Sequence, residues 1–182
     1  MKKYLVIGNP IDHSLSPLLH NFWIKKHGIS ASYEKKKIEK VNIEKILNNL
    51  RQNNVDGINV TVPFKKAVIP FLDELSITAK ETQSVNTIIK TGNKIIGENT
   101  DVYGFSEAIK LTNFDPKNKV ALILGAGGVS PSIIFALKNM GVSEIFLSNR
   151  TKEKAEILKN SFPYLKLLDW GKTTKFDLIV NA

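Results

Sequence analysis

An apolar run from Val120 to Leu124 leads directly into a glycine-rich turn, GAGGVS at 125–130, and a helical segment with Pro131 in its first turn follows. A buried strand, a glycine turn and a helix in this order bring backbone N–H groups and a helix N-terminus to one point. Such a point binds the pyrophosphate of a dinucleotide. The residues expected to contact it are Gly125, Ala126, Gly127, Gly128 and Val129. The alternative is a tight turn that binds nothing.

Ser130 stands where the usual glycine fingerprint has a third glycine or an alanine. We therefore expect looser packing of the helix against the strand at this position. The strand and helix on either side of the turn are what make the pattern informative, because a glycine motif alone is weak evidence.

The end of the next predicted strand indicates which dinucleotide is favoured. NAD-binding folds place an acidic residue about 20 residues after the glycine turn, where it holds the ribose 2′-hydroxyl. This chain has Asn149-Arg150-Thr151 in that region, followed by Lys154. The Arg150 guanidinium suits bidentate contact with a phosphate, and Thr151 adds a hydroxyl donor. The sequence therefore favours NADP (NADPH) as cofactor; Thr151 can also cap the next helix, and both roles are compatible.

Strands alternate with helices along the whole chain. In the first part we expect strands at 4–7, 32–38, 56–62, 87–90 and 94–98, and helices at 17–27, 42–53, 65–72 and 76–81. The last two strands form a hairpin, which is expected to be the only antiparallel pair. In the second part we expect strands at 120–124, 145–147, 165–168 and 178–180, and helices at 102–111, 131–139 and 152–160.

This alternation predicts an α/β protein of two units rather than one continuous sheet. Residues 1–101 are expected to form a mostly parallel sheet that binds substrate and carries the catalytic groups. Residues 102–182 are expected to form a Rossmann-like NADP-binding unit. The helix at 17–27 is expected to be amphipathic, with Phe22 and Trp23 in the core.

Composition excludes several kinds of chemistry. The 182 residues contain no cysteine, and three scattered histidines make a poor metal set. The net charge of +9 comes from short lysine groups spread along the chain, so a solvated surface is favoured over nucleic-acid binding. Attraction of small anionic ligands is the second interpretation of this positive charge. No membrane-spanning run or signal peptide is evident, and we expect a cytoplasmic protein without a membrane partner.

Lys65 follows the alternating run GINVTVPF at 57–64, at the end of a predicted buried strand. Hydride transfer to a ketone leaves negative charge on oxygen, and a lysine ammonium within reach can supply the proton. Asp101 lies at the boundary between the two predicted units, where a carboxylate could fix the position of the lysine. A surface lysine with no catalytic role is the alternative.

Six motifs in order resemble the shikimate dehydrogenase family. They are GNPIDHSLSPLLHN at 8–21, NVTVPFK at 59–65, VNT at 85–87, NTD at 99–101, GAGG at 125–128 and NRT at 149–151. The resemblance covers essentially the whole chain. It implies the NADP-dependent reduction of 3-dehydroshikimate to shikimate, in the synthesis of aromatic amino acid precursors.

The resemblance also implies residue roles. Lys65 and Asp101 correspond to the catalytic pair, with Lys65 as proton donor and acceptor. Ser14 and Ser16 correspond to residues that hold the substrate carboxylate, and Asn59, Thr61 and Asn86 to residues that bind the ring hydroxyls. An N-cap is a further role for Ser16, because Pro17 follows it. A quinate/shikimate dehydrogenase that uses NAD or NADP, and a noncatalytic dinucleotide-binding module, are the alternatives.

The chain departs from the family pattern at several positions. Gln83-Ser84 stands where Gly-Ala is common, Lys154 where arginine is common, and Pro131 where a basic residue is frequent. Lysine keeps the charge but loses the planar fork, so the preference for NADP is expected to be weaker. Members usually continue well beyond the position of Ala182, so we expect a fragment of such an enzyme that is inactive by itself. We expect a monomer or a homodimer.

Overall fold

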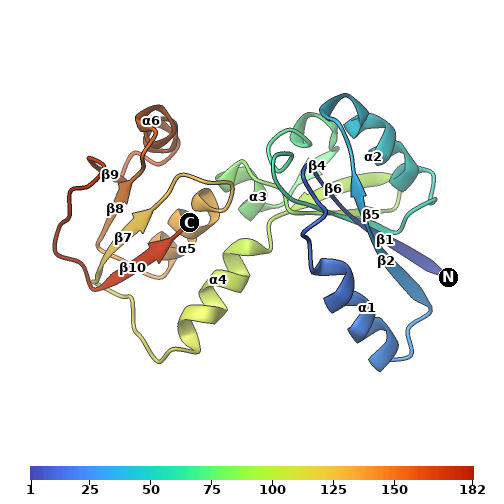
Figure 1. The fold of residues 1–182 in the computed structure, drawn as a ribbon, viewed down its shortest axis with the longest axis horizontal. Helices are drawn as coiled ribbons and strands as arrows, with labels where there is room; N and C mark the ends of the chain where they lie inside the picture. Colours follow the sequence, from blue (N-terminus) through green and yellow to red (C-terminus); the bar gives the residue numbers. More distant parts are fainter. The chain divides into compact units, whose positions relative to one another are not determined.

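The computed structural model describes all residues from Met1 to Ala182 and divides into two compact units, Met1–Asn99 and Thr100–Ala182. Each unit contains one β-sheet with helices packed on it (Figure 1). The prediction of two α/β units is therefore confirmed. No helix combines the length and the apolar composition needed to cross a membrane.

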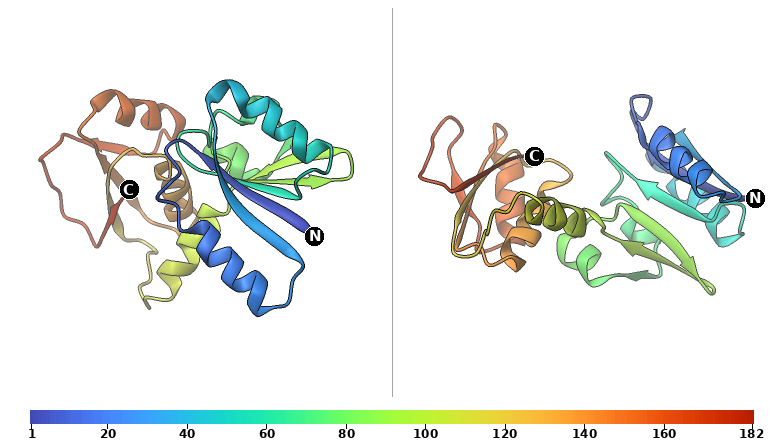
Figure 2. Two further views of the ribbon diagram at one scale, coloured as in Figure 1. Left: turned by 45° about the vertical axis from the view of Figure 1, so that its right-hand side comes forward. Right: turned by 90° about the horizontal axis from the view of Figure 1, so that it is seen from below.

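The first unit contains a six-stranded sheet in the order β2-β1-β3-β5-β6-β4. Its strands are β1 (Lys2–Gly8), β2 (Ala31–Lys37), β3 (Gly57–Val60), β4 (Glu74–Leu75), β5 (Thr87–Thr91) and β6 (Lys94–Glu98). Its helices are α1 (Ser16–Lys26), α2 (Ile43–Arg51) and α3 (Ile77–Thr82), with short 3₁₀ turns η1 (Lys40–Asn42) and η2 (Ile69–Phe71). Figure 2 shows α1 and α2 on opposite faces of this sheet.

Strand β1 is parallel to both β2 and β3, whereas β5 is antiparallel to β3 as well as to β6. The prediction that the hairpin is the only antiparallel pair was therefore wrong. The segment between β3 and β5 brings the chain back to the end of β3. Thr87, the first residue of β5, therefore pairs with Asn59 of β3. Strand β4 was missed because two residues carry no periodic signal.

Helix α2 buries the apolar face that its sequence predicts, formed by Ile43, Ile46, Leu47 and Leu50. Helix α1 does not follow its prediction, because none of its residues is buried. Phe22 is 59% exposed and Trp23 is 47% exposed, so their assignment to the core was wrong. Ile24 of α1 packs against the apolar cluster of Val6, Ile11 and Tyr33, and polar and ring contacts described below join the helix to the sheet as well.

The predicted helix at 65–72 is also wrong. Turns occupy its first part, and only the 3₁₀ turn η2 forms, with a proline in its first turn. Pro70 has no N–H to donate to the Lys66 carbonyl oxygen, which interrupts the hydrogen-bond ladder of an α-helix. Phe64 and Val68 are nonetheless buried and anchor the segment to the core.

Gln83 ends helix α3 in the left-handed conformation, with φ of 48°. A residue with a Cβ pays about 1 to 2 kcal/mol for this conformation, and glycine does not. We expect Gln83→Gly to raise the melting temperature by roughly 1 to 3 °C, even though it removes the bond from Gln83 Nε2 to the Lys80 carbonyl oxygen (2.7 Å). Gln83→Ala is the control, because it loses the same bond and keeps the strain. Equal melting temperatures for the two variants would contradict this explanation.

The second unit contains an all-parallel sheet in the order β10-β7-β8-β9. Its strands are β7 (Val120–Leu124), β8 (Glu144–Ser148), β9 (Lys166–Leu168) and β10 (Leu178–Asn181), and its helices are α4 (Asp101–Lys110), α5 (Ser130–Asn139) and α6 (Lys152–Ser161). This is the order of the first half of a Rossmann fold, in which the chain reverses direction across the sheet between β7 and β10. Ligands of such sheets bind outside the carboxyl ends of the strands at this reversal.

Candidate active site

Six polar side chains predicted to bind substrate belong to the first unit, and the structure brings them to one end of its sheet. They come from the segment after β1, the end of β3 with the turn that follows it, and the residue before β5: Ser14, Ser16, Asn59, Thr61, Lys65 and Asn86. Each of the six is half-buried. Half-burial suits residues that are fixed by the protein and still face a ligand.

Backbone hydrogen bonds hold the ends of β1 and β3 together. The Asn9 N–H donates to the Val62 carbonyl oxygen (3.1 Å), and the Thr61 N–H donates to the Ile7 carbonyl oxygen (2.9 Å). A Cβ at Gly8 would lie 2.6 Å from Thr61 Cγ2, which is closer than side-chain atoms approach. The glycine that begins the GNPI motif is therefore required by the close approach of the two segments.

A second pair of backbone bonds joins the turn after β3 to the residues before β5. The Val85 N–H donates to the Lys65 carbonyl oxygen (2.9 Å), and the Val60 N–H donates to the Asn86 carbonyl oxygen (2.8 Å). Lys65 is thus held at its backbone beside Asn86. These bonds are long-range in sequence, and the motif spacing alone could not indicate them.

The two serines occupy the start of α1 in a different way from the one predicted. The residue before the helix is Leu15, and no side chain caps the helix N-terminus. Instead, the Ser16 N–H approaches Ser14 Oγ at 3.4 Å. The prediction that Ser16 is the N-cap was wrong, and its hydroxyl is left available to a ligand at the helix N-terminus.

Asn59 is the centre of a side-chain network that orients its amide. Its Oδ1 accepts a hydrogen bond from the Tyr33 hydroxyl (2.7 Å), and its Nδ2 donates to the Asn86 carbonyl oxygen (3.2 Å) and to Thr87 Oγ1 (2.9 Å). The Thr87 hydroxyl in turn donates to Asn86 Oδ1 (3.1 Å). Both amide protons of Asn59 are therefore engaged within the protein, and only Oδ1 retains capacity for a ligand.

Tyr33 was not identified from the sequence. It is buried, and burial raises the pKa of its hydroxyl to about 12, so it remains a donor across the physiological range. His20 stacks on its ring, with the centroids 4.2 Å apart, and burial lowers the pKa of that histidine. Asn21 brackets its backbone, donating to the Tyr33 carbonyl oxygen (2.8 Å) and accepting from the Tyr33 N–H (3.0 Å). His20 and Asn21 of the first motif thus connect α1 to β2.

Asp101, the predicted partner of Lys65, belongs to the second unit and is the first residue of α4. A carboxylate at a helix N-terminus is stabilised by the helix dipole. The assignment of Asp101 to a pair with Lys65 remains a prediction.

The glycine turn is shaped by a close approach of two segments. Gly125 has φ of 112°, and a Cβ there would lie 1.9 Å from the carbonyl oxygen of Ala182. The Ala126 N–H donates to Asn149 Oδ1 (3.0 Å), which connects the turn to the end of β8. The N–H groups of Gly127 and Gly128, both exposed, donate to no backbone acceptor. They are the donors that a pyrophosphate would use.

The structure corrects the expectation of loose packing at Ser130. This residue is fully buried, and its hydroxyl donates to the Gly125 carbonyl oxygen (3.1 Å). Its side chain thus replaces the third glycine with a hydrogen bond that closes the turn. Helix α5 begins after Val129 without a side-chain cap, and the Ser130 N–H donates to the Gly127 carbonyl oxygen (3.2 Å).

A hollow of about 290 Å³ opens at the carboxyl ends of β7, β8 and β10. It is lined by Leu124, Gly125, Asn149, Arg150, Trp170, Asn181 and Ala182. Arg150 and Lys154 are exposed, and Thr151 precedes α6 without using its hydroxyl as a cap. The residues predicted to hold a 2′-phosphate are thus accessible, and Trp170 is a wall residue that sequence reasoning missed.

Two family models match the chain. Residues 6–88 match the shikimate dehydrogenase substrate binding domain, and residues 107–180 match shikimate / quinate 5-dehydrogenase. A Pelagibacter ubique protein named shikimate dehydrogenase (NADP(+)) is 56% identical over 181 residues, covering 100% of this chain and 68% of that protein. The chain belongs to the shikimate dehydrogenase family.

Solved structures of the family have the same fold. Shikimate dehydrogenase from Aquifex aeolicus shares 41% identity with a TM-score of 0.90, and the match covers 100% of this chain and 68% of that one. Shikimate 5-dehydrogenase from Thermus thermophilus, solved in complex with NADP(H) and shikimate, shares 35% identity with a TM-score of 0.90 and the same coverage. This chain therefore spans about two thirds of the length of these family members. The family and fold predicted from the sequence are confirmed.

Proposed function

We propose that the protein catalyses the reversible NADP-dependent reduction of 3-dehydroshikimate to shikimate. The observation that carries this proposal is the convergence of Ser14, Ser16, Thr61, Lys65 and Asn86 at one end of the first sheet. A small polyhydroxylated acid needs several fixed polar partners, and a site built to satisfy them rejects analogues that lack a hydroxyl. The relatives' names give the same substrate and cofactor.

We assign the substrate carboxylate to the hydroxyls of Ser14 and Ser16. The N-terminus of α1 favours an anion at that point, because the helix dipole has its positive end there. Asn59, Thr61 and Asn86 are assigned to the ring hydroxyls. For Asn59 the assignment is limited to Oδ1, since its amide protons are already engaged.

Lys65 is assigned as the proton donor in the reducing direction. NADPH supplies the hydride to the carbonyl carbon of the substrate. As negative charge develops on the carbonyl oxygen, the Lys65 ammonium gives it a proton and becomes a neutral amine. In the oxidising direction the neutral amine takes the hydroxyl proton back. Asp101 is assigned as the carboxylate that fixes the orientation of the lysine.

NADP is assigned to the second unit. Gly127 and Gly128 are placed to donate to the pyrophosphate, and Arg150, Thr151 and Lys154 to the 2′-phosphate. Position 149 holds an asparagine. Its Oδ1 accepts a hydrogen bond from the Ala126 N–H, and its Nδ2 donates to the Thr151 carbonyl oxygen (2.7 Å). An asparagine has no carboxylate to hold a ribose 2′-hydroxyl, and this supports NADP rather than dual cofactor use.

Binding tests the proposal on the chain itself. We expect shikimate to raise its melting temperature, and NADP to do so at lower concentration than NAD. Quinate, which differs from shikimate at the ring, is the comparison for substrate breadth. Stabilisation by NAD and NADP alike would contradict the assignment, and so would the absence of stabilisation by both shikimate and quinate.

We also propose that the protein is cytoplasmic and is a monomer or a homodimer without nucleic-acid or membrane partners. Cell fractionation tests the localisation, and sedimentation tests the oligomeric state.

Tyr33→Phe tests the network around Asn59. Removal of the hydroxyl frees Oδ1 of Asn59 and lets its amide reorient, so we expect the Kd for shikimate to rise about fivefold, equivalent to about 1 kcal/mol. Calorimetric titration measures this change. Tyr4→Phe is the matched control, because Tyr4 lies beside Tyr33 in the register of β1 and β2 and is not among the hydrogen-bond partners of Asn59. An unchanged Kd for shikimate in Tyr33→Phe would remove Tyr33 from a positioning role.

A further inference from the structure

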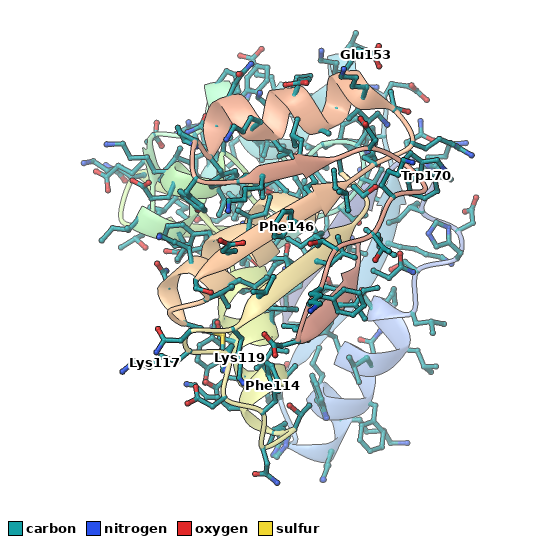
Figure 3. All side chains as sticks on the ribbon, turned by 90° about the vertical axis from the view of Figure 1, so that its left-hand side faces the viewer. Phe114, Lys117, Lys119, Phe146, Glu153 and Trp170 are labelled. Carbon is teal, nitrogen blue, oxygen red and sulfur yellow. The ribbon has the colours of Figure 1, made fainter.

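Trp170 is a large aromatic residue that the fold leaves exposed. It follows β9 in the second unit, and 59% of it is accessible to solvent. Figure 3 shows it at the end of the sheet where α6 begins, and Glu153 marks the first turn of that helix. An indole exposed beside a predicted cofactor site has a large apolar face available for a ligand.

Trp170 borders two hollows that flank Arg150. The first, of about 290 Å³, opens at the carboxyl ends of β7, β8 and β10. The second, of about 250 Å³, lies between β9 and α6. Asn149, Arg150 and Trp170 are the three residues that line both. The indole and the guanidinium thus border the same space.

The backbone around Trp170 is fixed by its neighbours. The Lys172 N–H donates to the Asp169 carbonyl oxygen (3.0 Å), which closes a turn over Trp170. Gly171 has φ of 83°, a conformation that a residue with a Cβ rarely adopts. The Ser148 hydroxyl approaches the same Asp169 carbonyl oxygen at 3.4 Å and connects this turn to the end of β8. Trp170 is therefore presented from a defined turn.

We propose that Trp170 is the stacking platform for the adenine ring of the dinucleotide, with Arg150 bordering the same ring. This inference rests on the proposed function and deepens its cofactor assignment. The first hollow combines apolar Leu124 and Trp170 with the amides of Asn149 and Asn181, which suits a flat purine with polar edges. A guanidinium can lie along an aromatic plane while the donors at its edge bind a phosphate.

The two residues are expected to act differently on cofactor choice. Adenine is common to NAD and NADP, so a stacking platform strengthens the binding of both. Arg150 is assigned to the 2′-phosphate, which only NADP carries. Loss of Trp170 is therefore expected to weaken both cofactors by the same factor, whereas loss of Arg150 changes their ratio.

Tryptophan fluorescence gives a direct test, because the chain contains only Trp23 and Trp170. In Trp23→Phe, which leaves Trp170 as the single tryptophan, we expect 2′,5′-ADP to quench the emission. Nicotinamide mononucleotide, which lacks adenine, is expected not to. In Trp170→Leu, calorimetry is expected to give a Kd for 2′,5′-ADP and for 5′-AMP about tenfold higher. Trp170→Phe should retain most of the affinity, and Trp23→Leu all of it.

Equal Kd values for 2′,5′-ADP in the parent chain and in Trp170→Leu would overturn the inference and leave the proposed function standing. A parent chain that does not bind 2′,5′-ADP would overturn the cofactor assignment and the inference together. Melting temperatures of both leucine variants establish that the folded state is being titrated. A lower affinity in Trp170→Leu that Trp170→Phe does not restore would also contradict stacking.

Discussion

In a version of the chain extended to the stop codon of its gene, replacement of Lys65 with Ala is expected to lower kcat for shikimate oxidation about a thousandfold, while the Kd for shikimate rises severalfold at most. General acid–base groups contribute roughly 10²- to 10⁴-fold to rate, and no other amine follows β3 at the predicted position except its neighbour Lys66. The backbone of Lys65 is fixed by the bond from the Val85 N–H (2.9 Å), so the substitution removes the amine without removing this anchor.

Lys66→Ala is the matched control, because Lys66 is adjacent, exposed and carries the same charge. Its kcat is expected to stay within about twofold of the parent value, as for surface substitutions away from a site. Steady-state rates give kcat, and equilibrium titration gives the Kd for shikimate. Undiminished turnover in Lys65→Ala, or equal losses in the two variants, would remove Lys65 from the mechanism.

Replacement of Arg150 with Ala is expected to raise the Kd for NADP roughly 10- to 100-fold and to leave the Kd for NAD nearly unchanged. A hydrogen bond to a charged group contributes about 1.5 to 3 kcal/mol, which corresponds to this range. Arg150 is exposed at the end of β8 and lines the hollow beside the glycine turn. Its loss therefore removes a phosphate contact without opening a cavity in the core.

Lys117→Ala is the control for net charge. Lys117 is exposed and precedes β7, at the opposite end of the same sheet, as Figure 3 shows. Removal of one positive charge there is expected to change the Kd for NADP less than twofold, because a charge at that distance is largely screened at physiological salt. A similar loss of NADP affinity in both variants would indicate long-range attraction rather than a contact at Arg150.

Local sequence patterns determined the elements that the sequence predicted well. The apolar run Val120–Leu124 is β7 with the same bounds, and the helical spacing of Ile43, Ile46, Leu47 and Leu50 is the buried face of α2. In both cases the periodicity of burial is a property of the segment itself.

Prediction from local sequence patterns failed for segments whose structure depends on tertiary contacts. Phe22 and Trp23 were predicted to lie in the core, yet both are exposed, and α1 contacts the first sheet through His20, Asn21 and Ile24. The helix predicted at 65–72 is replaced by turns and the 3₁₀ turn η2, because Pro70 has no N–H for an α-helical hydrogen bond. The pairing of β3 with β5 depends on the path of a long connection, which no local pattern encodes.

The candidate site divides in the same way. Lys65, Asn86 and Arg150 were predicted as site residues because they belong to compact motifs with a chemical reason for each residue type. Tyr33 and Trp170 were missed because neither belongs to a motif. Tyr33 reaches Asn59 only through the register of β2, β1 and β3, and Trp170 reaches Arg150 through the turn after β9.

Shikimate-dependent reduction of NADP, measured beside the same reaction with NAD, tests the central claim most directly. It should be followed in this chain and in a version extended to the stop codon of its gene, since family members are longer than this chain. We predict turnover in the extended version with NADP preferred over NAD, and little or no turnover in the chain alone. Absence of turnover in both versions, with correct folding shown by circular dichroism, would contradict the enzyme assignment and leave a noncatalytic dinucleotide-binding module as the better account.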